Sequence, residues 1–440
     1  MRRTLTVLAV LALAPAGLAQ ADPAPATTTL LSVATDGTAA GGSSLPAITP
    51  DGRYVAFASG APNIVAGDTN RATDVFVRDR QTGVTTRVSV DSTGAQANDR
   101  SWAPSISADG RYVVFLSDAT NLIASDTNRA QDVFLHDLVT GATSLVSRGW
   151  TGGWTGEQAN SQSFHPVISA DGDYIAFDSY ASNIVSDDTN GVHDVFETER
   201  ASGYTIRVSI DSNRFQGNGI SQRPSISADG EYVAFESDAS NIALFPDTNR
   251  ATDVFVHDRL SGRTDRVSLN PDGTEGNRPS RYVAISADGR YFAYTSYASN
   301  LVPGDTNNSS DMFLFDRTRN TVTRISVGPN GQQRPGGTTP DILPSITPDG
   351  RYVAYETGGD DLVPGDVNYA WDVFRWDRDT ATTSLISVAT DGTQGDRSSV
   401  TPSISADGRH IAFVSYAHNW VPTGLPDNAI SGNVFVRDLG

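Results

Sequence analysis

One short pattern recurs along the whole chain and constrains its fold more than any other feature. An Asp-Gly pair followed by an aromatic and apolar run begins at Asp51 and returns six times, with successive gaps of 58, 62, 58, 59, 61 and 58 residues. The later copies begin at Asp109, Asp171, Asp229, Asp288, Asp349 and Asp407. A long, regular period indicates a repeat architecture in which each copy is one supersecondary unit stacked on its neighbours. The repeats leave no segment for a second domain.

Each repeat contains four short runs typical of β-strands. In the second repeat they cover residues 104–107, 112–117, 132–137 and 143–147. The runs are rich in Val, Ile, Tyr and Phe and are bounded by turn residues, and no window shows the 3.6-residue period of an amphipathic helix. Four strands in each of seven units predict an all-β fold, a seven-bladed β-propeller with four antiparallel strands per blade.

The two ends of the repeat region complement each other. The last repeat stops after its third strand, at residues 434–438, and has no fourth. Residues 27–37 closely match residues 382–392, which form the fourth strand of repeat six and the loop after it. We therefore expect the N-terminal strand, about residues 27–33, to complete blade seven and close the ring, which ties both ends into one sheet.

The first 21 residues have the pattern of a secretory signal peptide. Arg2 and Arg3 precede an apolar stretch at residues 5–13, and Ala19-Gln20-Ala21 fits a cleavage site. The apolar stretch is shorter than the roughly 20 residues that a membrane-spanning helix needs. The sequence predicts a signal peptide at 1–21, a propeller domain at 22–440, and a secreted protein located in the periplasm, at the cell surface or outside the cell.

The composition excludes several kinds of chemistry. The chain has no cysteine and no lysine, so it can form no disulfide, cysteine-zinc site, lysine Schiff base or P-loop. A formal net charge of −19 argues against a nucleic-acid partner, since binding phosphates needs a basic surface. We expect a monomer that does not insert into a membrane and whose partner is a protein or a polysaccharide.

The connection between the second and third strands carries a recurring D-x-N-x-x-x-D pattern. Carboxylate and amide oxygens are ligands that calcium prefers, so the pattern predicts possible calcium sites. The alternative is that Asp and Asn cap turns with their own side chains, and both can hold together. A seventh copy keeps Asp427 but has Ala429 and Asn433 at the other places. The complete triplets are Asp68, Asn70 and Asp74; Asp126, Asn128 and Asp132; Asp188, Asn190 and Asp194; Asp247, Asn249 and Asp253; Asp305, Asn307 and Asp311; and Asp366, Asn368 and Asp372.

Aromatic residues break the symmetry of the repeats in a few connections. Exposed tryptophan and tyrosine rings can stack on sugars or anchor a protein partner, but they can equally form the small cores of long loops. The candidate ligand-binding aromatics are Trp102, Trp150, Trp154, Tyr369 and Trp371.

The segment Ser-Ala-Asp-Gly-Arg-Tyr-Val-Val-Phe at 107–115 and its six partners resemble the TolB-like β-propeller repeat. The resemblance covers nearly the whole chain after the signal peptide, but TolB itself has six blades and an added α/β domain, so its role is not implied. Oligogalacturonate lyases resemble the same family and use a His-rich metal centre. The six histidines here show no such pattern: His136 and His257 share a place with arginines, His193 lies in an acidic loop, and His165, His410 and His418 are scattered.

The lengths of the connections indicate which face carries function. The turns between strands one and two and between strands three and four are tight, whereas the other two connections are long and lie together on the opposite face. Long loops in a compact domain are often functional. We expect a non-catalytic binding or scaffold protein that engages its ligand on this acidic long-loop face. The alternative is a polysaccharide lyase or hydrolase at the mouth of the central channel, which would need asymmetric titratable groups converging in one place.

Overall fold

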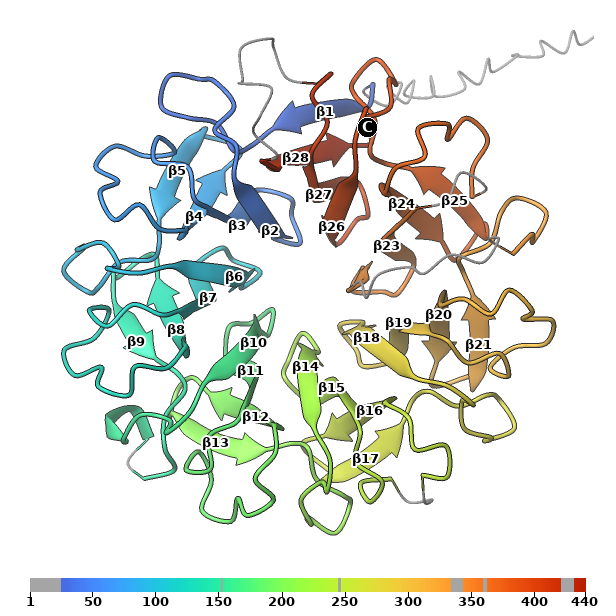
Figure 1. Cartoon of the computed structure of the whole chain (residues 1–440), viewed down its shortest axis with the longest axis horizontal. Helices are drawn as coiled ribbons and strands as arrows, with labels where there is room; N and C mark the ends of the chain where they lie inside the picture. Colours follow the sequence, from blue (N-terminus) through green and yellow to red (C-terminus); the bar gives the residue numbers. More distant parts are fainter. Residues whose placement is uncertain (1–24, 152, 244–246, 334–342, 359–361, 421–430) are drawn as a thin grey trace, which may run out of the picture.

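The β-branched and aromatic runs of the repeats form strands of two to six residues. The computed structural model describes residues 25–151, 153–243, 247–333, 343–358, 362–420 and 431–440, so the expected signal peptide lies outside the described residues. Each blade is a four-stranded antiparallel sheet, and the seven sheets stand around a common axis (Figure 1). The predicted seven-bladed propeller is confirmed.

The strands fall into four sets by their distance from the ring axis. The innermost strands are β2 (Ser43–Ile48), β6 (Ser101–Ile106), β10 (Ser163–Ile168), β14 (Ser221–Ile226), β18 (Ser280–Ile285), β22 (Ser345–Ile346) and β26 (Ser399–Ile404). The second strands are β3 (Tyr54–Ser59), β7 (Tyr112–Ser117), β11 (Tyr174–Ser179), β15 (Tyr232–Ser237), β19 (Tyr291–Ser296), β23 (Tyr352–Thr357) and β27 (His410–Ser415).

The third and fourth strands follow outward in the same order, and blades are numbered 1 to 7 from β2 onward. The third strands are β4 (Asp74–Asp79), β8 (Asp132–Asp137), β12 (Asp194–Glu199), β16 (Asp253–Asp258), β20 (Asp311–Asp316), β24 (Asp372–Asp377) and β28 (Asn433–Asp438). The fourth strands are β5 (Val84–Arg87), β9 (Thr143–Leu145), β13 (Tyr204–Arg207), β17 (Arg263–Arg266), β21 (Thr321–Arg324), β25 (Thr382–Leu385) and β1 (Thr27–Leu30).

Blade 7 is built from both ends of the chain, as the sequence predicts. Strand β1 pairs with β28 in antiparallel register, with Thr27 opposite Asp438 and Leu30 opposite Phe435. The two strands lie side by side at the junction of the first and last blades (Figure 1). Ring closure therefore places the outermost strand of the last blade at the start of the chain.

The innermost strands begin earlier than the sequence predicts. Strand β6 starts at Ser101, whereas the expected strand started at residue 104. Its pairing with β7 shifts register between Trp102 and Ser105, and Ala103 has a φ of 51°. This β-bulge adds a residue before Pro104. The strand continues through the bulge, but the sequence no longer shows the alternation of side chains that marks a strand.

The recurring Asp-Gly turn has a packing function between blades. Gly230 has a φ of 70°, and an added Cβ would overlap the ring of Tyr174 from the preceding blade. Gly52 receives His410 of blade 7 in the same way, so the contact runs around the closed ring. The motif thus combines a left-handed turn with a close approach that only glycine permits.

The core consists of clusters that each join neighbouring blades. The second and third strands are buried on both faces, and pairs such as Phe57 and Phe76 stack with ring centroids 5.7 Å apart. After each fourth strand, a small hairpin covers the outer edge of the next blade. Thr264 Oγ1 of β17, for example, donates to the carbonyl oxygen of Ile210 at 2.6 Å. Such covering protects an edge strand from pairing with other chains.

The described part of the chain contains one short 3₁₀ helix, η1 (Gly153–Thr155). No helix among the described residues has the length and apolar character needed to cross a membrane.

Candidate functional site

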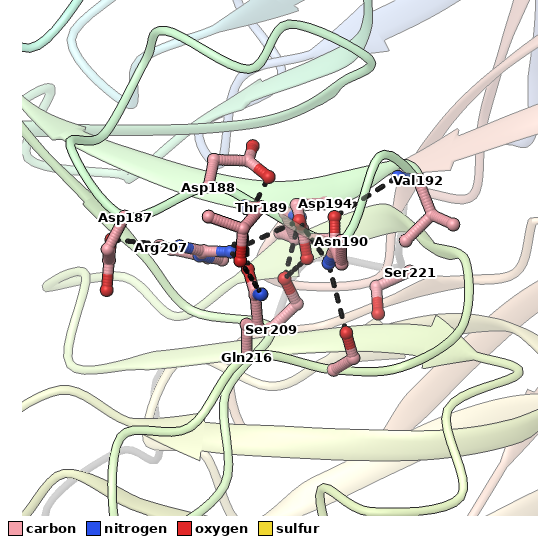
Figure 2. Close-up of polar contacts among 12 residues, drawn as sticks. Asp187, Asp188, Thr189, Asn190, Val192, Asp194, Arg207, Ser209, Gln216 and Ser221 are labelled. Atoms are coloured by element: carbon pink, nitrogen blue, oxygen red, sulfur yellow. Dashed lines mark hydrogen bonds and ion pairs between the residues drawn. The ribbon is translucent and has the colours of Figure 1, made fainter.

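The acidic loop of blade 3 shows how the D-x-N-x-x-x-D pattern folds (Figure 2). Asp194, the last residue of the pattern, begins β12 and is completely buried. Its Oδ1 accepts a hydrogen bond from Ser209 Oγ at 2.5 Å, and its Oδ2 accepts one from Asn190 Nδ2 at 2.8 Å. The carboxylate is thus tied to the fourth-strand segment and to its own loop.

The asparagine of the pattern is oriented by the backbone. Asn190 Oδ1 accepts a hydrogen bond from the N–H of Val192, and Nδ2 also donates to the carbonyl oxygen of Gly217. These two backbone contacts determine which end of the amide faces the carboxylate of Asp194. The nitrogen faces it and the oxygen is used in a turn, which is the capping role expected of Asn in such loops.

The other five complete triplets have the same architecture. In every blade from 1 to 6 the last Asp is the first residue of the third strand and accepts a serine hydroxyl, and the Asn oxygen accepts the backbone N–H two residues on. The Asp–Ser pairs are Asp74–Ser89, Asp132–Ser147, Asp194–Ser209, Asp253–Ser268, Asp311–Ser326 and Asp372–Ser387, at 2.5–2.7 Å. In the seventh copy, Asp427 and Ala429 lie outside the described residues.

An arginine from the fourth strand neutralises four of the six clusters. In blade 3, Arg207 Nη1 lies 3.4 Å from Asp194 and 3.8 Å from Asp188, and its side chain is 3% exposed. Arginines 87, 266 and 324 hold the same place in blades 1, 4 and 5. Leu145 and Leu385 hold it in blades 2 and 6. The cation that balances these carboxylates is therefore part of the protein in four blades.

Blade 4 contains a group of acids that could hold a metal ion. Single carboxylate oxygens of Asp247, Asp253 and Glu275 all lie within 4.8 Å of one another. Arg266 lies beside them, with Nε 3.5 Å from Asp253 and a hydrogen bond from Nη1 to Glu275. Burial raises the pKa of Asp253 to about 6. The donor set suits a hard cation, and a guanidinium already lies against it.

The loop of blade 2, like that of blade 6, receives no fourth-strand arginine. Asp126 Oδ1 is buried without a hydrogen-bond partner among the described residues. Burial raises the pKa of Asp132 to about 7. Arg148 lies nearby but donates from Nε to the carbonyl oxygen of Leu145 and from Nη1 to that of Gly156. The fourth strand thus supplies no cation to this acidic loop.

The five candidate aromatic residues do not form one surface. Trp102 lies in β6, half-buried beneath the guanidinium of Arg100, and not in a loop. Trp154 lies in η1 and donates from Nε1 to the carbonyl oxygen of Arg200 at 2.9 Å, so it anchors its loop to blade 3. Trp371 is half-buried and lies just before β24. Only Trp150, at 60%, and Tyr369, at 90%, are strongly exposed, and they belong to different blades.

A cluster that the sequence did not predict lies where the inner strands of blades 3 and 4 meet the long-loop face. His165 on β10 places Nδ1 2.9 Å from Asp178 Oδ1, and His193, just before β12, places Nε2 3.2 Å from Asp178 Oδ2. Asp178 is fully buried. Burial lowers the pKa of His193 below its ordinary value. The expectation that the histidines are scattered is therefore wrong for this pair.

Blade 4 extends the same cluster towards blade 5. Arg223 on β14 donates from Nη1 to Glu236 Oε1 at 2.6 Å, and its backbone N–H donates to Asp178 at 3.1 Å. The N–H of Tyr282 donates to Glu236 Oε2 at 3.1 Å. We call His165, Asp178, His193, Arg223 and Glu236 the inner-end cluster.

The cluster arises from departures from the repeat. Asp178 and Glu236 occupy the fifth place of the second strand, as does Glu356 in blade 6; blades 1, 2, 5 and 7 have Ala58, Leu116, Thr295 and Val414 there. His165 and Arg223 have positive φ values of 46° and 53° at the inner-strand bulge. The signal in the sequence is the change from uncharged to acidic residues at the fifth place of the second strand. It is seen only when the repeats are aligned, and not from the spacing of residues within one repeat.

The inner-end cluster offers both hydrogen-bond donors and acceptors beside an aromatic ring. Tyr180 is 50% exposed and stacks on His193 with centroids 3.9 Å apart. With Nδ1–H of His165 donating to Asp178, Nε2 of the ring remains as an acceptor or base. The His165 side chain is 37% exposed, so the imidazole ring that carries Nε2 is accessible to a ligand.

Comparison with known proteins supports the fold. No family model matches the chain, and no curated protein matches it. An oligogalacturonate lyase in complex with manganese is 13% identical with a TM-score of 0.53, and the match covers 94% of this chain and 97% of the lyase. The β-propeller domain of the Trilobed protease from Pyrococcus furiosus is 11% identical with a TM-score of 0.53, covering 90% and 93%.

TolB from Acinetobacter baumannii is 16% identical with a TM-score of 0.43, and the match covers 78% of this chain and 62% of that TolB chain. Likenesses at these identities establish the architecture alone. The likeness in fold rests on the lyase and the protease propeller domain, and this chain has seven blades.

Proposed function

We propose that this chain is an exported binding propeller that holds a carbohydrate at the inner-end cluster. The observation that carries the proposal is the unequal distribution of polar groups around the ring. The acidic loops repeat in six blades and are capped internally, whereas His165, Asp178 and Arg223 come together only between blades 3 and 4. A specific ligand needs such an asymmetric place.

The chemistry of the cluster favours a carbohydrate. Sugar hydroxyls both donate and accept, and the cluster presents a carboxylate–arginine pair, Glu236 and Arg223, beside the imidazole of His165. The exposed ring of Tyr180 provides a surface on which a sugar ring can stack. The expected signal peptide at 1–21 supports export, where polysaccharides are encountered.

The test is binding of a panel of neutral and acidic oligosaccharides, measured by calorimetry. We expect one class to bind and His165→Ala to weaken it by about tenfold or more, as loss of a hydrogen-bonded polar group does. Leu45→Ala is the matched control, because Leu45 holds the same bulge position in blade 1 with a φ of 51°. The proposal fails if no oligosaccharide binds, or if the two variants weaken binding equally.

A second candidate is a polysaccharide lyase or hydrolase at the same place. The specific observation is the contact between His165 Nδ1 and Asp178, which leaves Nε2 as a general base. The lyase among the similar structures shares the fold. Incubation with oligouronides, followed by ultraviolet absorbance for unsaturated products and by reducing-end assays for hydrolysis, separates this candidate from binding alone. Product formed by the wild type and absent with His165→Ala would support it.

We further propose that calcium orders the acidic loop of blade 2. Support comes from Asp126 and Asp132, whose carboxylates lack the fourth-strand arginine because Leu145 replaces it. Backbone carbonyls and water would have to supply the remaining ligands. We expect calcium to raise the unfolding temperature of the EDTA-treated protein, with the rise lost in Asp132→Asn and kept in Asp194→Asn. No rise at millimolar calcium, or a rise that Asp132→Asn retains, contradicts the proposal.

A further inference from the structure

Glu197 places a buried carboxyl group at a repeat position where the other six blades have a different residue. It is the fourth residue of β12, and the same place holds Val or Leu in five blades and Arg375 in blade 6. The Glu197 side chain is 1% exposed. A buried carboxyl in a column of aliphatic residues reduces stability unless its oxygens find donors.

Neither oxygen of Glu197 has a hydrogen-bond partner among the described residues. The nearest cation is Arg259, whose Nε lies 3.7 Å from Glu197 Oε2. That Nε–H donates instead to the carbonyl oxygen of Gly230 at 3.1 Å, and the guanidinium lies over the ring of Tyr174, 4.2 Å from its centroid. Both acceptor atoms are therefore buried without a hydrogen-bond donor from the described residues.

Beside Glu197 lies a crevice between blades 3 and 4, with a volume of about 390 Å³. Glu197 lines it together with Ile206 and Ile210, which provide an apolar wall, and Tyr204, which is 66% exposed at its rim. These residues come from the third and fourth strands and the hairpin after them, so the crevice lies on the outer part of the ring. The inner-end cluster belongs to the inner strands.

The charged groups around the crevice are mostly engaged elsewhere. Arg207 is held by Asp187, Asp188 and Asp194 of the acidic loop. His257 bonds to Thr264 through Nδ1, and burial lowers its pKa to about 4, so it is neutral near pH 7. The remaining charged groups that line the crevice are Glu199, Arg214 and Arg259.

We propose that the crevice between blades 3 and 4 binds a small molecule carrying a primary ammonium group, with Glu197 accepting its N–H donors. An ammonium group supplies three donors and the positive charge that a desolvated carboxylate requires. The apolar wall of Ile206 and Ile210 receives the carbon chain of the ligand, and Tyr204 contacts it at the rim. This site is independent of the carbohydrate proposed for the inner-end cluster.

Proton release accompanies binding. Burial raises the pKa of Glu197 to about 8, so most of the free protein carries a protonated Glu197 at pH 7. The ammonium group binds the ionised carboxylate, and the proton leaves to solvent. Between pH 7 and 8.5 the ionised fraction rises roughly eightfold, and affinity rises with it.

The probe is butylammonium chloride, with butanol as the neutral molecule of the same shape and sodium chloride to match ionic strength. Calorimetry on the full chain should show saturable binding of butylammonium, none of butanol, and tighter binding at pH 8.5 than at pH 7. Glu197→Gln, which keeps the size and removes the charge, should weaken binding by more than about tenfold. Glu197→Val, which restores the residue of blades 1, 4 and 7, should abolish binding and raise the unfolding temperature.

Three results would overturn the proposal. The first is an absence of saturable butylammonium binding at millimolar concentration. The second is equal binding by Glu197→Gln, which would exclude the carboxylate as the acceptor. The third is equal binding of butanol, which would make the crevice an apolar site. Because Glu197→Gln preserves the volume of the side chain, this variant tests the proposal even if Glu197→Val fails to fold.

Discussion

Replacing Arg207 by leucine tests whether the acidic loops depend on a cation supplied by the protein. Arg207 is 3% exposed and contacts Asp194, which is fully buried, and Asp188, which is 3% exposed. Leucine occupies the same place in blades 2 and 6, so the side chain fits this position of the repeat. The change therefore removes the charge with little steric cost.

The expected loss follows from leaving two carboxylates without their partner. Removing one member of a buried ion pair costs about 3–5 kcal/mol, because the remaining charge stays desolvated. Burial already raises the pKa of Asp188 to about 6, and that of Asp194 is also raised by burial. Without Arg207 both should rise further. The loss should thus be largest at about pH 8 and clearly smaller at about pH 5, where the carboxyls accept protons.

Urea unfolding at the two pH values measures the effect as a change in the free energy of unfolding. Arg78→Leu is the control, because Arg78 is half-buried in β4, bonds to Thr85 and contacts no acid among the described residues. We expect this variant to lose under about 1 kcal/mol. A loss below about 1 kcal/mol for Arg207→Leu at pH 8, or an equal loss at both pH values, would refute the reasoning.

Three further predictions follow from the fold. Burial raises the pKa of Asp132 and of Glu356 to about 7, so the folded state binds more protons than the unfolded state between about pH 4 and 7. The free energy of unfolding should therefore fall as pH rises through this range, and Asp132→Asn should flatten the slope measured by urea unfolding. Gly230→Ala and Gly262→Ala both place alanine at a positive φ, but only the first overlaps a tyrosine ring. Chemical unfolding should show a cost of about 1 kcal/mol for Gly262→Ala and about 1–3 kcal/mol more for Gly230→Ala, and equal costs would contradict the interblade contact. Deleting residues 25–31 removes β1, and circular dichroism should show a lower unfolding temperature, whereas an unchanged one would mean that β1 contributes nothing to closure.

The repeat made the architecture predictable from sequence. The period fixed the number of blades, and the match between residues 27–37 and 382–392 revealed the closure by β1. The inner strands were harder, because the bulge at Ala103 interrupts the alternation that marks a strand. The sequence therefore predicts Trp102 in a connection, whereas the structure places it in β6.

The candidate sites were less predictable because they depend on contacts between distant parts of the repeat. The loop pattern showed its carboxylates but not Arg207, which comes from the fourth strand, β13, and completes the charge balance. His165 and His193 are 28 residues apart and converge only because β10 and β12 flank β11. The sequence pattern does not single out Glu197, whose lack of partners depends on where Arg259 directs its Nε–H.

Closure by β1 also has a consequence for how the ring assembles. Thr28 and Arg437 are 409 residues apart in sequence and are joined by a hydrogen bond in blade 7. Contacts of such long range are slow to form, because the entropy of closing the intervening loop is lost before the contact contributes. During synthesis, blades 1 to 6 can form and stack in order while β1 is still unpaired, because its partner β28 has not yet been made. Strand β28 then provides the antiparallel partner of β1, so the ring cannot close before β28 has been made.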